Sequence, residues 1–151
     1  MIPYVSVIVT AFNQAKSISQ TLDSILEQEC DFKFEIIIGD DLSIDGTREI
    51  CEGYQKLFPK VIRIHYQNEN IGVGANFASC VKQASGKYIA ICAADDYWHN
   101  HQKLKLQVNF LESNPDYGLL YTDYNKLNDN TNKITENYLK RSKKPTNVGG
   151  D

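Results

Sequence analysis

The sequence predicts an α/β fold, a Rossmann-like sandwich with a mostly parallel sheet and helices on both faces. Apolar, β-branched runs alternate with segments of helical periodicity along most of the chain. The apolar runs end in turn-forming or acidic residues, as buried strands do. With 151 residues and a hydrophobic content of 42%, the chain is long enough for one packed core.

The first half of the chain carries two strand–helix pairs. Residues 4–11 form an apolar, β-branched run that ends at a turn, which is typical of a buried strand. A capping-box pattern at residues 17–20 then begins a helix that continues to about Glu29. Residues 34–39 repeat the buried-strand pattern. The helix after them ends at Pro59, because proline cannot continue the helical hydrogen bonds.

The second half begins with two further pairs. Residues 61–66 alternate apolar and polar side chains, and a helix from Val73 is closed by Gly86 as its C-terminal cap. Residues 88–92 form the most apolar strand and are expected to be the most buried. After another amphipathic helix, a short strand at 118–122 completes the sheet. Alternation of this kind favours parallel pairing, because each helix carries the chain back along the sheet.

The domain division is expected after residue 124, where the composition changes. Residues 1–124 would form the core, whereas 125–151 are dominated by Asn and Lys. Such a tail buries too little apolar area to offset its ordering entropy. We expect it to be loosely held, or to be the start of a further part that this truncated core lacks.

The charge balance argues against a nucleic-acid partner. The chain has 16 basic and 19 acidic residues, a net charge of -3, and therefore no strong positive field. No apolar run approaches the roughly 18 residues of a membrane span, and no leader is visible, so we expect a cytoplasmic protein. The basic cluster at 140–144 could touch lipid headgroups, giving a peripheral membrane association; a solvated linker is the plainer interpretation.

The cysteines and histidines do not form a metal-binding pattern. The four cysteines are widely spaced and lie within apolar segments, as reduced core thiols do. His99 and His101 alternate at the start of a helix without a third suitably spaced ligand. We therefore interpret them as solvent-facing.

Pairs of carboxylates follow two predicted strands. Asp40 and Asp41 follow the second strand, and Asp95 and Asp96 follow the fourth. The carboxyl ends of parallel strands meet at one edge of a sheet, so both pairs should face one crevice. Acidic groups there need water, a donor or a cation. Asp95 and Asp96 would suit Mg²⁺ or Mn²⁺ together with phosphate oxygens; a turn or helix-cap role is the alternative.

Residues near the first two strand ends could contact a nucleobase. Asp41 could accept a hydrogen bond from the imide N–H of a uracil ring. The segment Thr10, Ala11, Phe12 and Asn13 could offer backbone groups and an aromatic edge. Both segments also fit ordinary turns, since residues 40–47 are rich in side chains that bond to their own backbone.

Five segments, taken in order, resemble glycosyltransferase family two. The resemblance extends over residues 4–124. The segments are VSVIVTAFN at 5–13, IGDDLSIDGT at 38–47, NIG at 70–72, ASGKYIA at 84–90 and ADDYW at 94–98.

This resemblance implies a GT-A fold and the transfer of a sugar from a nucleoside diphosphate sugar, with a UDP-sugar favoured. The acceptor would be a hydroxyl of a glycan, a lipid-linked glycan or another molecule, the anomeric carbon would be inverted, and Mn²⁺ or Mg²⁺ would assist. By the same resemblance, the nucleobase pocket and metal site can be assigned. Thr10, Phe12, Asn13 and Asp41 would line the pocket with Ala11, Asp95 would contact the ribose, and Asp96 would bind the metal.

Three departures from the family pattern bear on this expectation. Many members have an acidic residue where this chain has Ala93, so the metal would rest on Asp95 and Asp96. Many also have an arginine early in the helix that follows the NIG segment, whereas residues 73–78 of this chain are VGANFA and contain no arginine to bind the phosphates. The catalytic base is expected beyond Asp151, so the isolated chain is expected to be inactive. Asp123 is the other carboxylate placed near the same rim.

Other functions remain as alternatives. A nucleotide-sugar-binding module without catalysis would need only the residues already named. A sugar nucleotidyltransferase would normally have a Gly-rich, Arg-containing loop after the first strand. In this chain residues 11–14 at that place are AFNQ, with no glycine or arginine. A dinucleotide-binding dehydrogenase is disfavoured because no Gly-x-Gly-x-x-Gly opens the first helix.

Overall fold

The computed structural model describes residues 2–128 and 131–138. These residues form two compact units, which divide after Ser113. The boundary expected after residue 124 stays a prediction. Each unit is described by itself.

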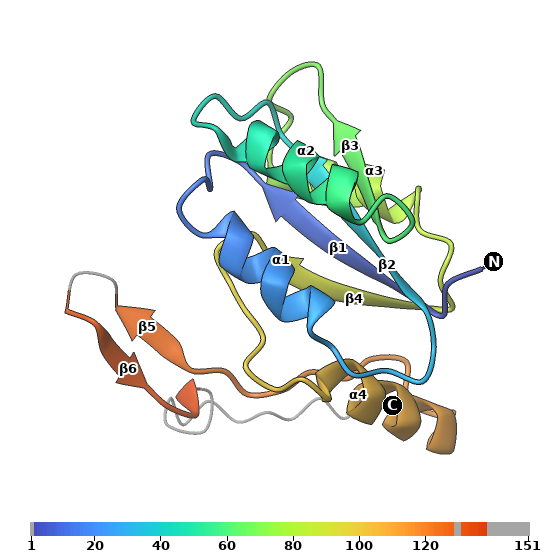
Figure 1. The fold of residues 1–151 in the computed structure, drawn as a ribbon. Coiled ribbons are helices and arrows are strands. Elements are labelled where there is room, and N and C mark those ends of the chain that lie inside the picture. The colour runs from blue at the N-terminus through green and yellow to red at the C-terminus, as the bar shows by residue number, and fades with distance from the viewer. Residues whose placement is uncertain (1, 129–130, 139–151) are drawn as a thin grey trace. The chain divides into compact units, whose positions relative to one another are not determined.

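The first unit confirms the α/β fold. Its sheet has four parallel strands in the order β3-β2-β1-β4 (Figure 1). In chain order the elements are β1 (Val5–Ala11), α1 (Ile18–Leu26), β2 (Phe34–Asp40), α2 (Thr47–Leu57), β3 (Ile62–Tyr66), α3 (Val73–Val81), β4 (Tyr88–Ala93) and α4 (Lys103–Ser113).

Helices cover both faces of the sheet. Val7 and Val9 of β1 lie in a core with apolar residues of α1, α2 and α4. Ile8 points to the opposite face of the sheet, where it packs with Ile37 of β2 and with Cys80 of α3. Figure 1 shows α1 and α2 in front of the sheet and α3 behind it. The central strands are therefore buried on both sides, as their continuous apolar sequences predicted.

The prediction that 88–92 would be the most buried strand is wrong. Ile89 is 45% exposed and Ile91 is 62% exposed. In the described part of the chain β4 pairs with β1 alone and forms the edge of the sheet. Helix α3 packs over β1 and β2, so one face of β4 stays open.

Gly86 was expected to cap α3 and does not. The helix ends at Val81 with Lys82 as its C-cap. Gly86 instead lies against β1, where an added Cβ would come 2.6 Å from the backbone nitrogen of Ser6. The glycine is needed for this close approach and not for a helix end.

The second unit contains a short hairpin. Strands β5 (Lys126–Asn128) and β6 (Lys133–Thr135) pair antiparallel. The strand predicted at 118–122 is not formed, since no described strand pairs with it and a strand needs a neighbour for its hydrogen bonds. The basic cluster at 140–144 and the rest of the predicted tail beyond residue 138 lie outside the described residues.

The cysteines are all free, and three are buried: Cys51, Cys80 and Cys92. Burial raises the pKa of Cys51 and Cys92 to about 12, so these thiols stay protonated at neutral pH. The predicted core location is confirmed for these three, whereas Cys30 is only partly buried. Among the residues that the structure describes, no helix is long and apolar enough to pass through a bilayer.

Candidate functional site

Two acidic segments are attached to the same strand end. The backbone N–H of Asp41 donates to the carbonyl of Ala11 at 2.9 Å, and the N–H of Ala94 donates to the carbonyl of Thr10 at 3.2 Å. Thr10 and Ala11 are neighbours at the end of β1, the strand that lies between β2 and β4. Asp41 and the Asp95–Asp96 segment therefore lie on either side of one strand end.

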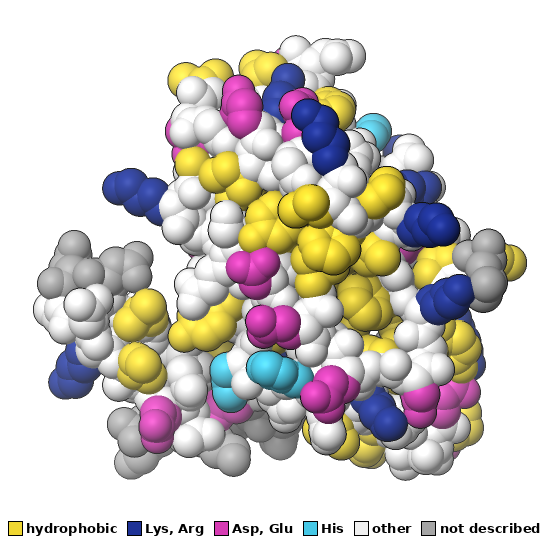
Figure 2. Space-filling view, viewed as in Figure 1, with side chains coloured by type: hydrophobic (Ala, Val, Ile, Leu, Met, Phe, Trp, Pro, Cys, Tyr) yellow, Lys and Arg dark blue, Asp and Glu magenta, His cyan; other side chains and the backbone are white. Residues whose placement is uncertain are grey.

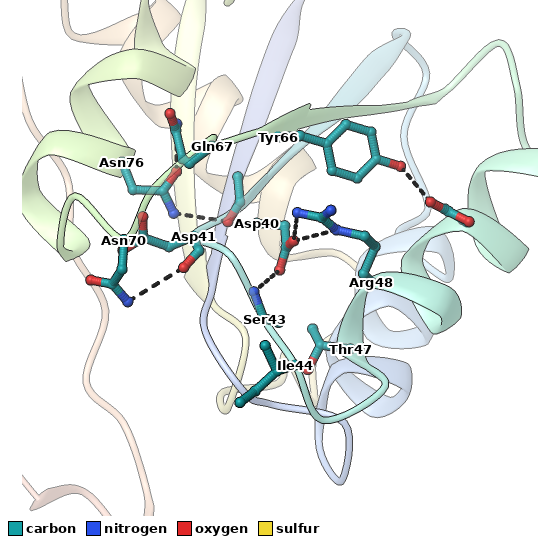
Figure 3. A network of polar contacts seen from close by, with 12 residues as sticks. Asp40, Asp41, Ser43, Ile44, Thr47, Arg48, Tyr66, Gln67, Asn70 and Asn76 are labelled. Carbon is teal, nitrogen blue, oxygen red and sulfur yellow. Dashed lines mark hydrogen bonds and ion pairs between the residues drawn. The ribbon is translucent and has the colours of Figure 1, made fainter.

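Asp40 does not face this edge, and the expectation that it would is wrong. Its side chain is fully buried and paired with Arg48 of α2, with Nε at 2.9 Å and Nη2 at 2.8 Å from the same carboxylate oxygen (Figure 3). Only Nε is oriented to donate a hydrogen bond. Successive side chains of a strand alternate, and at Asp40 the alternation turns the carboxylate toward α2. The Arg48 guanidinium also lies over the Tyr66 ring, 4.7 Å from its centroid.

Asp41 is held by the loop that precedes α3. One carboxylate oxygen accepts the N–H of Ile71 at 2.9 Å, and the other accepts the N–H of Gly72 at 2.8 Å. The Asn70 amide donates to the Asp41 carbonyl at 3.4 Å (Figure 3). The residue is only 3% exposed. Each oxygen still has lone-pair capacity for a further donor.

The loop after β1 is bonded to the loop after β2. The N–H of Asn13 donates to the Ser43 hydroxyl at 3.0 Å, and the Asn13 side-chain oxygen accepts the N–H of Ile44 at 2.9 Å. Asn13 has a φ of 54°, a conformation that asparagine tolerates. Phe12 beside it is 46% exposed. Within this pair of loops, Asn13 fixes the backbone and Phe12 offers an aromatic surface.

Asp45 adds a second set of bonds between these loops. It accepts hydrogen bonds from the Thr47 hydroxyl at 2.5 Å and from the N–H of Ala15 at 3.0 Å. These bonds lower the pKa of Asp45, with the Thr47 hydroxyl contributing most. The Thr47 hydroxyl in turn accepts the N–H of Gln14 at 2.7 Å.

Asp95 and Asp96 sit in a tight turn after β4. The N–H of Asp96 donates to the carbonyl of Ala93 at 3.0 Å, and both carboxylates are on exposed residues. Burial, followed by the charge of Asp95, raises the pKa of Asp96. An added cation would relieve the repulsion between these charges.

This donor set fits a hard divalent ion. Carboxylate oxygens are the ligands that Mg²⁺ and Mn²⁺ take, and one or two are sufficient when substrate phosphates and waters complete the shell. In the described residues no place gathers three or more His, Cys, Asp or Glu side chains. Two carboxylates from the chain are thus what this turn offers.

A polar stripe on α1 and the residues that flank the helix, which was not predicted from the sequence, contacts the segment that carries Asp95 and Asp96. Its members are spaced so that they fall on one side of the helix, next to the apolar face. Such spacing among residues flanking an apolar face is the signal that could have revealed them. The members are Ser17, Thr21, Ser24 and Gln28, and their partners are backbone groups of Ala94, Asp96, Trp98, Asn100 and Leu104.

Other candidates do not join these residues. His99 and His101 are exposed, as expected, and His101 lies 3.7 Å from Glu27. Asp123 belongs to the second unit, where its side chain accepts the N–H of Tyr124 at 2.9 Å. Its predicted place near the rim stays a prediction. Acidic and basic side chains are interspersed over the face viewed in Figure 2.

The sequence matches a known family over most of its length. Residues 6–149 match the family described as glycosyl transferase family 2. The chain belongs to this family. This chain is similar to an uncharacterized protein of Mycobacterium tuberculosis, Rv1520. The two are 38% identical over 111 residues, which cover 74% of this chain and 32% of that protein.

Two solved glycosyltransferases have the same fold. S. aureus TarS in complex with UDP is 32% identical with a TM-score of 0.63, covering 72% of this chain and 32% of that one. The mannosyltransferase PcManGT from Pyrobaculum calidifontis, in complex with GDP-Man and Mn²⁺, is 29% identical with a TM-score of 0.66, covering 74% of this chain and 33% of that one. This chain has the GT-A fold. It spans about a third of the length of Rv1520, of PcManGT and of residues 1-349 of TarS.

Proposed function

We propose that the protein transfers a sugar from a nucleoside diphosphate sugar to a hydroxyl acceptor, with inversion at the anomeric carbon. The donor is a UDP-sugar, and the acceptor is a glycan or a lipid-linked glycan. This chain supplies the donor-binding residues. The two similar structures, one with UDP and one with GDP-Man and Mn²⁺, support a nucleotide-sugar donor.

The attachment of both acidic segments to the end of β1 is the observation that carries this proposal. Asp41 bonds to Ala11, and Ala94 bonds to Thr10. A nucleotide bound across this strand end would meet Asp41 on one side and Asp95 and Asp96 on the other. In open parallel sheets, ligands bind at the carboxyl ends of the strands.

Each side chain has a separate proposed role. Phe12 would pack against the nucleobase, and Thr10 and Ala11 would border it. Asn13 would hold the loop, and Asp41 would accept from the base while keeping the 70–72 loop in place. Figure 3 shows the hydrogen bond from the Asn70 amide to the Asp41 carbonyl, which joins this loop to the end of β2.

The turn after β4 would serve the diphosphate. Asp95 would accept hydrogen bonds from the ribose hydroxyls, and Asp96, with Asp95, would hold Mn²⁺ or Mg²⁺. When bound, the ion neutralises charge that develops on the leaving diphosphate. Holding both carboxylates in one short turn keeps their separation small, which is what a shared cation requires.

Thermal unfolding with UDP and Mn²⁺ tests this proposal. At ligand concentrations about tenfold above Kd, binding should stabilise the protein by about 1.4 kcal/mol and raise Tm by about 3–5 °C. Asp96→Ala should remove the metal-dependent part of the rise, while Asp116→Ala, at an exposed residue of the second unit, should keep it. Replacing UDP with GDP tests whether the protein prefers uracil to guanine as the nucleobase of its donor. An unchanged Tm at millimolar UDP and GDP would contradict the proposal.

The alternative is a nucleotide-sugar-binding module without catalysis. It predicts the same rise in Tm but no sugar release from UDP-sugars. Measuring free sugar and UDP from UDP-sugars with Mn²⁺ separates the two when it is done both with this chain and with a longer version of the protein that continues past Asp151, because only a transferase gains sugar release in the longer version. A sugar nucleotidyltransferase, the other alternative, would instead consume a sugar phosphate and a nucleoside triphosphate.

A further inference from the structure

We propose that Thr21 of α1 is a positioning residue for the Asp95–Asp96 turn, acting with Ser17; this inference rests on the proposed function. The Thr21 hydroxyl lies 2.7 Å from the carbonyl oxygen of Asp96 and 3.0 Å from that of Ala94. These carbonyls belong to the residues on either side of Asp95. One buried side chain therefore contacts the backbone both before and after that carboxylate.

The placement of Ser17 supports a role beyond ordinary packing. Ser17 stands at the N-cap of α1, where a serine hydroxyl usually accepts an N–H of its own helix. In this structure it makes no such cap bond. Its hydroxyl lies 2.9 Å from the carbonyl of Ala94. The predicted capping box is therefore wrong: Ser17 has φ -117° and ψ -28°, and not the extended backbone of a capping serine.

The contacts continue along the helix with regular spacing. The Ser24 hydroxyl accepts the N–H of Trp98 at 3.0 Å. The Gln28 amide donates to the carbonyl of Asn100 at 2.9 Å and accepts the N–H of Leu104 at 3.0 Å. Helix α1, together with Gln28 just beyond its end, thus holds the segment from the turn to the start of α4, and Thr21 makes the contact nearest the two carboxylates.

The turn needs such support because its two charges repel. Asp95 and Asp96 are adjacent carboxylates in one short turn, and both are exposed residues. With no tether, the turn could relieve this repulsion by rotating one carboxylate away. Thr21 is 1% exposed, so water cannot readily replace its hydrogen bond to the turn. Outer residues that orient ligands typically change metal affinity by about 10–100-fold.

The test compares Thr21→Val, which keeps the shape and removes the hydroxyl, with Thr21→Ser, which restores it. The matched control is Ser6→Ala. Ser6 is fully buried, and its hydroxyl donates to Glu35 at 2.7 Å and accepts the N–H of Gly86 at 2.9 Å, near the start of β1. The control therefore removes a buried hydroxyl far along the strand from the turn.

Two measurements read the effect. Calorimetry with UDP and Mn²⁺ should show affinity about 10-fold weaker for Thr21→Val, but within about twofold of wild type for Thr21→Ser and Ser6→Ala. Hydrogen exchange without ligand should show faster exchange of the Asp96 amide in Thr21→Val alone. If Thr21→Val does not fold, Ser17→Ala removes the second hydroxyl from the Ala94 carbonyl and should weaken the affinity in the same direction.

The outcomes separate this inference from the proposed function. Wild type that binds neither UDP nor GDP with Mn²⁺ overturns the proposed function and this inference with it. Wild-type binding that Thr21→Val leaves unchanged overturns this inference alone. An equal loss in Thr21→Val and Ser6→Ala also overturns it, because the effect would then be one of general stability.

Discussion

The carboxylate of Asp41 accepts the backbone N–H of Gly72 at 2.8 Å, which joins the end of β2 to the start of α3. Its other oxygen accepts the N–H of Ile71. Asp41 is therefore both a proposed ligand-binding residue and a residue that fixes the loop at 70–72. This double role means that changing Asp41 should affect both stability and nucleotide binding.

Asp41→Asn should destabilise the protein by about 1–3 kcal/mol. An asparagine has a single side-chain oxygen, so its amide nitrogen would face one of the two backbone donors and leave that N–H unsatisfied. Urea unfolding measures the change. Asp116→Asn, at an exposed position, should stay within about 0.5 kcal/mol of wild type. Equal stability of the two variants would contradict the role assigned to Asp41.

Two glycines should respond to alanine in opposite directions. A Cβ on Gly39 of β2 would lie 2.4 Å from both Asn76 Oδ1 and Cys80 Sγ, so Gly39→Ala should destabilise by about 1–3 kcal/mol. A Cβ on Gly53, inside α2, would meet nothing within 4 Å. Gly53→Ala should therefore stabilise by about 0.5–1 kcal/mol through helix propensity. Thermal unfolding of both variants checks the signs, and a stable Gly39→Ala would show that α3 can move away from β2.

The sequence could predict which strands exist, but not where each lies in the sheet. The apolar run of β1 and that of β4 look alike, yet Ile8 is fully buried and Ile91 is 62% exposed. The difference arises from which strands pair and which helix covers them. Those are relations between distant segments, and hydrophobic periodicity does not encode them.

The candidate site shows the same limit. Asp40 and Asp41 are identical in type and adjacent, yet one is paired with Arg48 and the other with a loop backbone. The partners of the two side chains depend on the alternation of side chains along the strand and on which segment lies on each face of the sheet. The polar stripe could not be predicted for a related reason: its partners are backbone groups of the segment after β4, more than 70 residues along the chain.

Leu42 holds a backbone conformation that leucine rarely adopts. Its φ is 65°, in the left-handed region that costs a side chain with a Cβ about 1–2 kcal/mol. Leu42→Gly should relieve this strain and, after the greater entropy of the unfolded glycine is subtracted, stabilise by about 0.5–1 kcal/mol. Leu42→Ala keeps the Cβ and should give no gain. Urea unfolding of the two variants checks the prediction, and a gain in Leu42→Ala would point to the side chain as the source of the strain.

Glu112 of α4 should contribute to stability only above acidic pH. Hydrogen bonds from Lys87, Tyr4 and Tyr88 lower its pKa from 4.5 to about 2, with Lys87 contributing most. A carboxyl with a lowered folded pKa stabilises fully above its unfolded pKa, and the contribution disappears as pH falls toward the folded pKa. Its contribution should therefore decrease between about pH 4.5 and pH 2.

Glu112→Gln tests this dependence, because glutamine cannot titrate. The difference in unfolding free energy between wild type and Glu112→Gln should be constant above about pH 5 and shrink as the pH is lowered toward 2. Other carboxylates titrate in both proteins and cancel in the difference. Urea unfolding across this range measures it. A difference that does not change with pH would mean that packing of α4, and not the charge of Glu112, accounts for its effect.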